Sequence, residues 1–123
     1  MHHLVGQHCL IDAYAVDEAW SKDAVQIEAL LRKVAKAAQA TIINSHFHTF
    51  GEGGGVTGVL LLAESHISIH TWPENAYIAV DIFMCGQHHI QAALEAFKSL
   101  LPSTHINVRI FSRGEALVPV NLK

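Results

Sequence analysis

The sequence predicts a single α+β domain, a two-layer sandwich in which an antiparallel sheet carries two helices on one face. The chain has 123 residues, half of them apolar, which suits one domain with a substantial core. Strand-like and helical patterns follow in the order strand, helix, several strands, helix, strand. Only short turns separate the middle strands, and directly joined strands pair antiparallel. Two amphipathic helices then suffice to cover one face of the sheet.

The first half of the chain contains two predicted strands around a helix. Residues 3–14 and 40–50 are rich in apolar, β-branched or aromatic side chains, which favours strands. Residues 17–39 are predicted to be helical, because apolar side chains recur at helical spacing in Ile27, Leu30, Leu31, Val34 and Ala38. Residues 51–55 read GEGGG, and four glycines in five residues predict a turn or loop.

The second half contains four predicted strands and one helix. The strands are expected at residues 56–63, 65–71, 77–85 and 106–111, with Pro73 after the second of them. A helix is expected at residues 88–101. The strand at 77–85 alternates most clearly, with one face formed by Tyr77, Ala79, Asp81, Phe83 and Cys85.

Composition excludes several classes of function. The net charge is −3 and no basic stripe is present, so nucleic acid is a poor partner. No apolar run approaches the roughly 20 residues that span a membrane, and the first residues do not resemble a secretory signal. Two cysteines form no disulfide framework, which favours a cytoplasmic protein. Ten histidines occur without a recognised ligand spacing, so no metal site is expected.

The strand at residues 56–63 is apolar on both of its faces. Two helices cover only one side of a sheet, and an exposed apolar face is a liability. Either the sheet is distorted, or its second face packs on another subunit. We favour the second alternative, a dimer formed through the sheets or their edges.

The stretch LAESHISIHTWPENAYIAVDIFMCG, residues 62–86, concentrates polar side chains among strand-forming residues. Taken singly, its serine, histidines and cysteine are ordinary strand residues. In combination, ESHISIHTWPE followed by YIAVDIFMCG closely resembles the S-adenosylmethionine decarboxylases in their small prokaryotic form. The resemblance covers nearly the whole chain, including GQHCLIDAY, SHFHTF and GVTGV.

The resemblance implies that the chain cuts itself between Glu64 and Ser65. The products would be a β chain of residues 1–64 and an α chain of residues 65–123 that begins with a pyruvoyl group derived from Ser65. Decarboxylation leaves a carbanion for which no unmodified side chain is an adequate electron sink, and the pyruvoyl ketone supplies one through a Schiff base. No external cofactor is then needed. The implied product is the aminopropyl donor of spermidine biosynthesis.

The resemblance also assigns roles to five further residues. His70 matches the base that takes the Cα proton during self-cleavage, and Thr57 stands where relatives usually carry a serine whose hydroxyl assists. Cys85 matches the acid that reprotonates carbon after CO2 leaves, and a thiol keeps its proton at neutral pH. Phe50 matches an aromatic that stacks on adenine, and Glu74 a carboxylate that binds the ribose hydroxyls. Without the resemblance, Phe50 would be a core aromatic and Glu74 a solvated turn residue.

The spacing of Ser65 and His70 points to a shared site. Five residues of extended strand span roughly 16 Å, and the two side chains lie on opposite faces. They can meet only if the chain bends sharply or if His70 serves Ser65 of another subunit. We therefore expect an (αβ)2 dimer with two sites at its interface. One protomer would supply Ser65 and Cys85, and the other Phe50, Thr57, His70 and Glu74.

Two segments depart from the pattern of the family. The GEGGG loop replaces a shorter loop that commonly contains proline, and QHHIQAAL after Gly86 replaces a more acidic segment. Because the loop follows Phe50, the departure concerns the substrate more than the reaction. Arginine or ornithine decarboxylation with the same pyruvoyl chemistry is therefore an alternative. An unprocessed, non-catalytic homologue is a second one.

Overall fold

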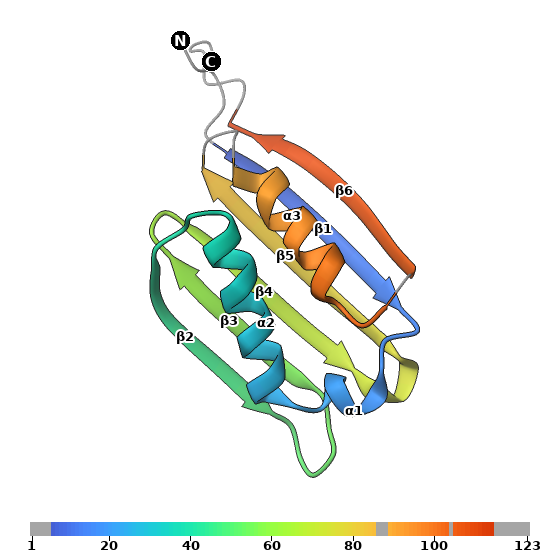
Figure 1. The fold of residues 1–123 in the computed structure, drawn as a ribbon. Coiled ribbons are helices and arrows are strands. Elements are labelled where there is room, and N and C mark those ends of the chain that lie inside the picture. Colours follow the sequence, from blue (N-terminus) through green and yellow to red (C-terminus); the bar gives the residue numbers. More distant parts are fainter. Residues whose placement is uncertain (1–5, 86–88, 104, 115–123) are drawn as a thin grey trace, which may run out of the picture.

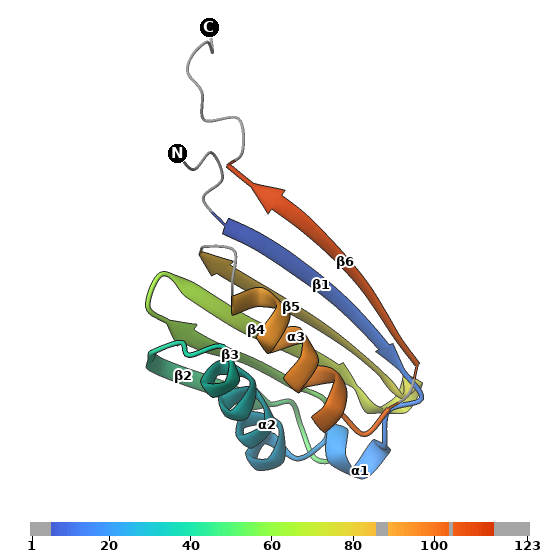
Figure 2. The same ribbon diagram turned by 45° about the horizontal axis from the view of Figure 1, so that its top comes forward.

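The computed structural model describes residues 6–85, 89–103 and 105–114, and it confirms the predicted α+β class. Six strands form one sheet in the order β2-β3-β4-β5-β1-β6, and every neighbouring pair is antiparallel. The strands are β1 (Gly6–Tyr14), β2 (Ile42–Thr49), β3 (Val56–Leu62), β4 (Ser65–Trp72), β5 (Tyr77–Cys85) and β6 (His105–Arg113). The helices are α1 (Glu18–Ser21), α2 (Ala24–Ala37) and α3 (His89–Leu100), with a 3-10 turn η1 (Pro73–Asn75). Helices α2 and α3 lie side by side against one face of the sheet (Figures 1 and 2).

The prediction of one continuous helix at residues 17–39 is wrong. The chain forms α1, turns at Lys22 and Asp23, and begins again with α2. The break arises because the Asp23 carboxylate accepts hydrogen bonds from the amides of Val25 and Gln26, at 3.0 and 3.1 Å. A side chain that satisfies these free amides defines a helix start.

The remaining boundaries differ from the predictions by a few residues. Strand β2 is shorter than predicted, and β6 is longer by one residue at its start and two at its end. The predicted strand positions 3–5 and the predicted helix start at His88 lie outside the described residues.

The core lies between the helices and the facing side of the sheet. The buried helical residues recur at the spacing that predicted the helices: Ile27, Leu30, Leu31, Val34 and Ala35 on α2, and Ile90, Ala93, Leu94 and Phe97 on α3. Alternate residues of the strands complete the core, among them Leu60, Ile67, Ile69 and Ile82, all 0% exposed. Full burial of such a side chain contributes roughly 1.5–3 kcal/mol.

The glycine-rich loop between β2 and β3 is a tight turn, as predicted. Gly51 and Gly53 have φ values of +64° and +68°, a conformation that glycine adopts without steric cost. The amide of Phe50 donates to the carbonyl of Gly55 at 2.9 Å and closes the loop. Phe50 is thereby held at the end of β2 with 53% of its surface exposed.

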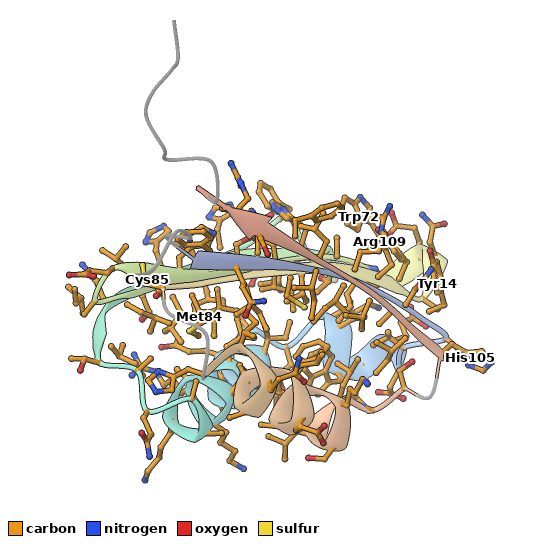
Figure 3. The ribbon with its side chains drawn as sticks, turned by 90° about the horizontal axis from the view of Figure 1, so that it is seen from above. Tyr14, Trp72, Met84, Cys85, His105 and Arg109 are labelled. Atoms are coloured by element: carbon orange, nitrogen blue, oxygen red, sulfur yellow. The ribbon has the colours of Figure 1, made fainter. Side chains whose placement is uncertain are left out.

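The sheet face that points away from α2 and α3 is called the open face here. Figure 3 shows Trp72 and Arg109 projecting from it, whereas Met84 points toward the helices. Val59 and Leu61 are 38% and 47% exposed on β3, so both sides of this strand are apolar, as predicted. The expectation that the second face of the sheet is apolar is wrong at the centre of the open face. The side chains there are polar or charged: His8, His66, Ser68 and Asp81.

Among the described residues, no helix is both long and apolar enough to cross a membrane.

Candidate active site

The Glu64–Ser65 bond lies in the hairpin turn between β3 and β4. Leu62 and Ser65 are the last paired residues of the two strands, so Ala63 and Glu64 alone form the connection. Glu64 has a φ of +61°. This left-handed conformation costs a residue with a side chain about 1–2 kcal/mol. The bond predicted to break therefore follows directly on a strained residue.

Cys85, the last residue of β5, contacts both sides of this bond. Its thiol Sγ lies 2.8 Å from the carbonyl oxygen of Glu64 and donates a hydrogen bond to it. Its backbone amide donates to Oγ of Ser65 at 3.3 Å. The contacts withdraw electron density from the carbonyl and leave the Ser65 hydroxyl proton free for another acceptor. The thiol contact favours attack of Oγ on the neighbouring carbonyl carbon, and the amide contact fixes the position of Oγ beside it.

Thr57 and His70 lie directly opposite each other on β3 and β4. The Thr57 hydroxyl and Nδ1 of His70 are 3.1 Å apart, within hydrogen-bond distance. This bond fixes the orientation of the imidazole. In the tautomer that carries its proton on Nδ1, the ring donates to the Thr57 hydroxyl and Nε2 can accept a proton. Their proximity agrees with the paired roles that the resemblance implies.

A hollow on the open face brings these two residues together with Phe50 and Glu74. Glu74 lies in η1, whose first residue, Pro73, is buried and fixes the turn. Trp72 lines the same hollow, and its ring lies 6.0 Å from that of His70. The hollow thus combines exposed aromatic surface, a carboxylate, a hydroxyl and an imidazole. These groups suit a nucleoside with ribose hydroxyls.

The structure therefore brings the predicted residues together in two separate groups within one chain. Glu64, Ser65 and Cys85 meet at one end of β4, and His70 faces the hollow toward the other end. Ser65 is in phase with buried Ile67, whereas His70 belongs to the opposite face of the strand. A single extended chain does not unite Ser65 with His70, and the contribution of the two groups by different protomers stays a prediction.

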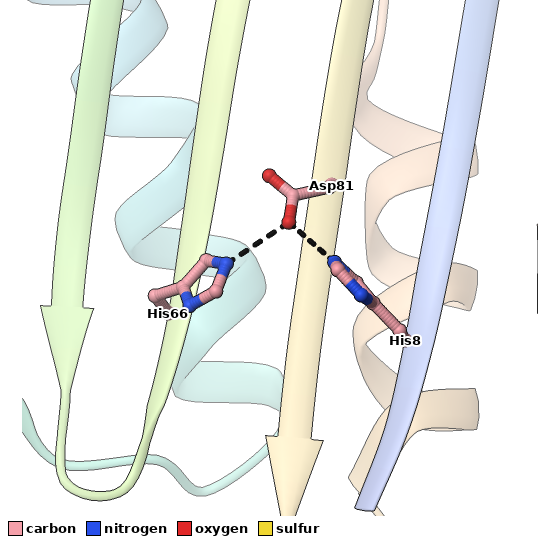
Figure 4. Close-up of side chains that lie close together, drawn as sticks. All are labelled: His8, His66 and Asp81. Carbon is pink, nitrogen blue, oxygen red and sulfur yellow. Dashed lines mark hydrogen bonds and ion pairs between the residues drawn. The ribbon is translucent and has the colours of Figure 1, made fainter. Parts of the chain in front are cut away.

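Sequence reasoning missed a polar cluster at the centre of the open face. It is formed by His8, His66 and Asp81 (Figure 4), together with Ser68. Nε2 of His8 and Nε2 of His66 lie 2.6 and 2.9 Å from the same oxygen of Asp81, Oδ2. Ser68 donates to the other oxygen. Burial raises the pKa of Asp81, but the hydrogen bonds from Ser68, His8 and His66 outweigh it and hold the pKa below its usual range.

Among the described residues, His8, His66 and Asp81 are the group that could hold a metal ion, with ligand atoms within 4.8 Å of one another. However, the guanidinium of Arg113 lies 3.1 Å from Nδ1 of His8. Since arginine only donates, Nδ1 accepts and the His8 proton resides on Nε2, pointing at Asp81. That nitrogen then has no lone pair for a metal, so the chemistry of the donor set favours a hydrogen-bonded cluster.

Sequence reasoning also missed the aromatic ladder beside the hollow. Trp72 stacks on Tyr77 with ring centroids 5.3 Å apart, and Tyr77 stacks on Tyr14 at the same distance. The Tyr77 hydroxyl donates to Asp12 at 2.5 Å, a bond that, with burial, raises the pKa of Tyr77 to about 12. The alternation of β5 was enough to place Tyr77 and Asp81 on one face of the sheet. The contacts of Tyr77 with Tyr14 and Asp12 arise because β1 pairs with β5, and the sequence pattern does not show this pairing.

Cys9 on β1 is the second cysteine and is a buried thiol. It is 0% exposed, and burial raises its pKa to about 11. Such a thiol is unreactive at neutral pH, so Cys85 is the reactive candidate.

The fold and site define a class: a two-layer α+β protein with a strained Glu–Ser bond held by a cysteine. The chain matches the family model for S-adenosylmethionine decarboxylase over residues 7–114. It therefore belongs to the S-adenosylmethionine decarboxylase family.

Individual relatives agree with this assignment. An S-adenosylmethionine decarboxylase proenzyme from Sulfurihydrogenibium sp. (strain YO3AOP1) is 42% identical over 122 residues, which cover 98% of this chain and 90% of the relative. A proenzyme of the same name from Parasynechococcus marenigrum (strain WH8102) is 51% identical over 85 residues, 69% of this chain and 66% of the relative. The crystal structure of the adenosylmethionine decarboxylase from Aquifex aeolicus VF5 superposes with a TM-score of 0.83 at 36% identity, covering 98% of this chain and 96% of that one.

Proposed function

We propose that this member of the family is a precursor that cleaves itself between Glu64 and Ser65 and then decarboxylates S-adenosylmethionine. The observation that carries the proposal is the placement of Cys85. Its thiol hydrogen-bonds the carbonyl of the bond to be broken, and its amide holds the hydroxyl that attacks. Relatives named as proenzymes support a cleaved precursor.

Cleavage requires only groups of the chain and water. Oγ of Ser65 attacks the Glu64 carbonyl carbon, and the C–N bond gives way to a C–O ester while the amine of Ser65 is released. Removal of the Cα proton of Ser65 by a base then expels the Glu64 carboxylate and leaves dehydroalanine. Water converts this residue into the pyruvoyl group and ammonia. The base is His70, whose ring is oriented by the Thr57 hydroxyl.

The residues around position 65 fit a pyruvoyl group. When present, its ketone accepts the electron pair left by departing CO2. The Cys85 thiol already lies at the Glu64–Ser65 bond and is a proton donor for the reacting carbon. Cleavage frees this thiol from the Glu64 carbonyl, so one side chain serves both steps in turn.

The hollow supports S-adenosylmethionine as the substrate. Phe50 and Trp72 present aromatic surface to an adenine, and the Glu74 carboxylate can accept from ribose hydroxyls. Glu74 is the one carboxylate among the described residues that line this hollow. A guanidinium can also stack on an aromatic ring and pair with a carboxylate, but arginine and ornithine have neither a purine for Phe50 and Trp72 nor ribose hydroxyls for Glu74. S-adenosylmethionine therefore uses more of the groups that line the hollow.

The active form is a dimer with two shared sites. Ser65 and Cys85 of one protomer face Phe50, Thr57, His70 and Glu74 of its partner. Two observations support this arrangement: the two groups are separated along β4, and Val59 and Leu61 are exposed on the open face.

An intact mass spectrum of the purified protein tests the cleavage. We expect chains that end at Glu64 and begin at position 65 with a pyruvoyl mass, and a Ser65→Ala control that stays whole. Incubation of the cleaved protein with borohydride and, in parallel, S-adenosylmethionine, arginine or ornithine identifies the substrate through the mass of the trapped adduct. A wild-type chain that stays whole contradicts the proposal and favours the non-catalytic alternative.

Mixing two inactive variants tests the shared site. Ser65→Ala lacks the nucleophile and His70→Ala lacks the base, so neither cleaves alone. After unfolding and refolding together, the His70→Ala chain should be cut, because its Ser65 meets His70 of the partner. If mixed dimers form and no cleavage follows, the two residues act within one chain.

A further inference from the structure

Self-cleavage creates a mechanical problem at position 65. In the precursor, this residue is held on both sides, by the turn through Glu64 and by β4. After cleavage it becomes a chain end, and chain ends fray unless they are tied down. The reacting ketone must nevertheless stay within hydrogen-bond reach of Cys85. The only covalent attachment left is the peptide bond to His66.

His66 is tied to the neighbouring strand by two contacts. Its Nε2 donates to Asp81 on β5 at 2.9 Å (Figure 4). Its ring also stacks on Phe83, its direct partner in the β4–β5 register, with centroids 6.0 Å apart and an interplanar angle of 22°. Phe83 and Asp81 share one face of β5 with Cys85. The side chain of His66 is thus linked to the strand that carries the proton donor.

The acceptor for this hydrogen bond is itself fixed. His8 on β1 donates to Asp81 at 2.6 Å, and the Arg113 guanidinium at its Nδ1 keeps the His8 proton on the side of Asp81. Ser68 donates to the second oxygen. Asp81 therefore remains an ionised acceptor in a set position, and it joins β4 to β5 and β1.

We propose that His66 is a positioning residue that holds the new N-terminus of the α chain through Asp81 and Phe83. The inference rests on the self-cleavage proposed above. It assigns a role to the central cluster that is distinct from the chemistry at Ser65, Cys85 and His70. The role begins when the chain is cut, because only then does residue 65 lose its second attachment.

Two substitutions remove the hydrogen bond in different ways. His66→Phe keeps a ring that can stack on Phe83 but cannot donate, and Asp81→Asn removes the anionic acceptor. His46→Phe is the matched control, since His46 is an exposed strand histidine of the same face on β2, away from the cluster. Each is made in the cleavable chain and in the uncleavable Ser65→Ala chain.

Hydrogen–deuterium exchange of the peptide covering residues 65–71 is the first readout. In the cleaved chain, we expect exchange at least tenfold faster for His66→Phe and Asp81→Asn than for wild type and His46→Phe. In the Ser65→Ala chain, where the turn is intact, the same substitutions should change exchange less than threefold. A purely structural role would raise exchange equally in both backgrounds, and that result overturns the proposal.

Steady-state kinetics are the second readout. In His66→Phe and Asp81→Asn, kcat should fall about tenfold because the reacting group is less well positioned. KM should change less than twofold, because neither substitution alters the hollow that binds the nucleoside. Unchanged exchange and kcat in both variants contradict the proposal. Failure of both variants to cleave also contradicts the proposal, because the hydrogen bond would then be needed for cleavage itself and not only after it. A wild-type chain that is not cut is a separate result, which refutes the proposed function instead.

Discussion

Replacement of Cys85 by alanine should slow self-cleavage. The thiol donates at 2.8 Å to the Glu64 carbonyl oxygen, which gains negative charge when Ser65 attacks. A methyl group offers no donor, so the developing charge loses one of its stabilising contacts. Cys9 is a buried thiol that lies opposite Ile82 in the β1–β5 register and does not contact this bond, so Cys9→Ala is the matched control.

The size of the effect follows from the donor and its surroundings. Removal of one well-placed donor to an oxyanion costs a reaction roughly 100- to 1,000-fold. A thiol is a weak donor, and this contact is exposed to solvent, so we expect an effect smaller than this range. A slowing of about 10- to 100-fold corresponds to roughly 1.4–2.7 kcal/mol. Cys85→Ser restores a donor with a slightly shorter reach and should recover part of the rate.

The assay follows the precursor after refolding from urea, with the fraction of cut chain measured by mass spectrometry over time. The order of rates should be wild type and Cys9→Ala, then Cys85→Ser, then Cys85→Ala. A Cys85→Ala chain that is cut as fast as the wild type would show that the thiol does not assist cleavage, and the reasoning from this contact would fail.

Two further predictions concern stability. A Cβ at position 58 would overlap the ring of Phe47, which packs against the core, so Gly58→Ala should lower the free energy of unfolding by about 1–3 kcal/mol in urea titrations; an unchanged midpoint would mean that the ring moves aside freely. Because the folded-state pKa of Asp81 is lowered, its stabilising contribution is present above its unfolded pKa of about 3.9 and is lost as the pH falls through the folded value. Between pH 5 and pH 2, the free energy of unfolding in urea titrations should therefore fall less for Asp81→Asn than for the wild type. Equal losses would contradict the lowered pKa of Asp81.

Much of the fold could be predicted because the patterns are local. The alternation of β5 and the helical spacing of Leu30, Leu31 and Val34 each lie within one element. The break before α2 depends on the side chain of one residue, Asp23, inside a continuous helical pattern, and periodicity does not register it.

The candidate site divides in the same way. The number of residues between Ser65 and His70 was enough to predict that their side chains do not meet within one extended strand. The cluster around Asp81 was missed, because His8 reaches it only when β1 lies beside β5. Strands that are 73 residues apart in sequence meet there, and no local pattern carries that information.

The distance between Ser65 and His70 along β4 also bears on when the precursor matures. In the proposed mechanism, a newly made chain carries both the bond to be cut and the base that completes the cut, and it keeps them apart along one strand. With the base supplied by a partner, maturation becomes a second-order event whose onset depends on protein concentration. Dilute precursor would show a lag before any cleavage. Because only folded chains can form the dimer, the backbone would stay intact until both chains have folded and associated.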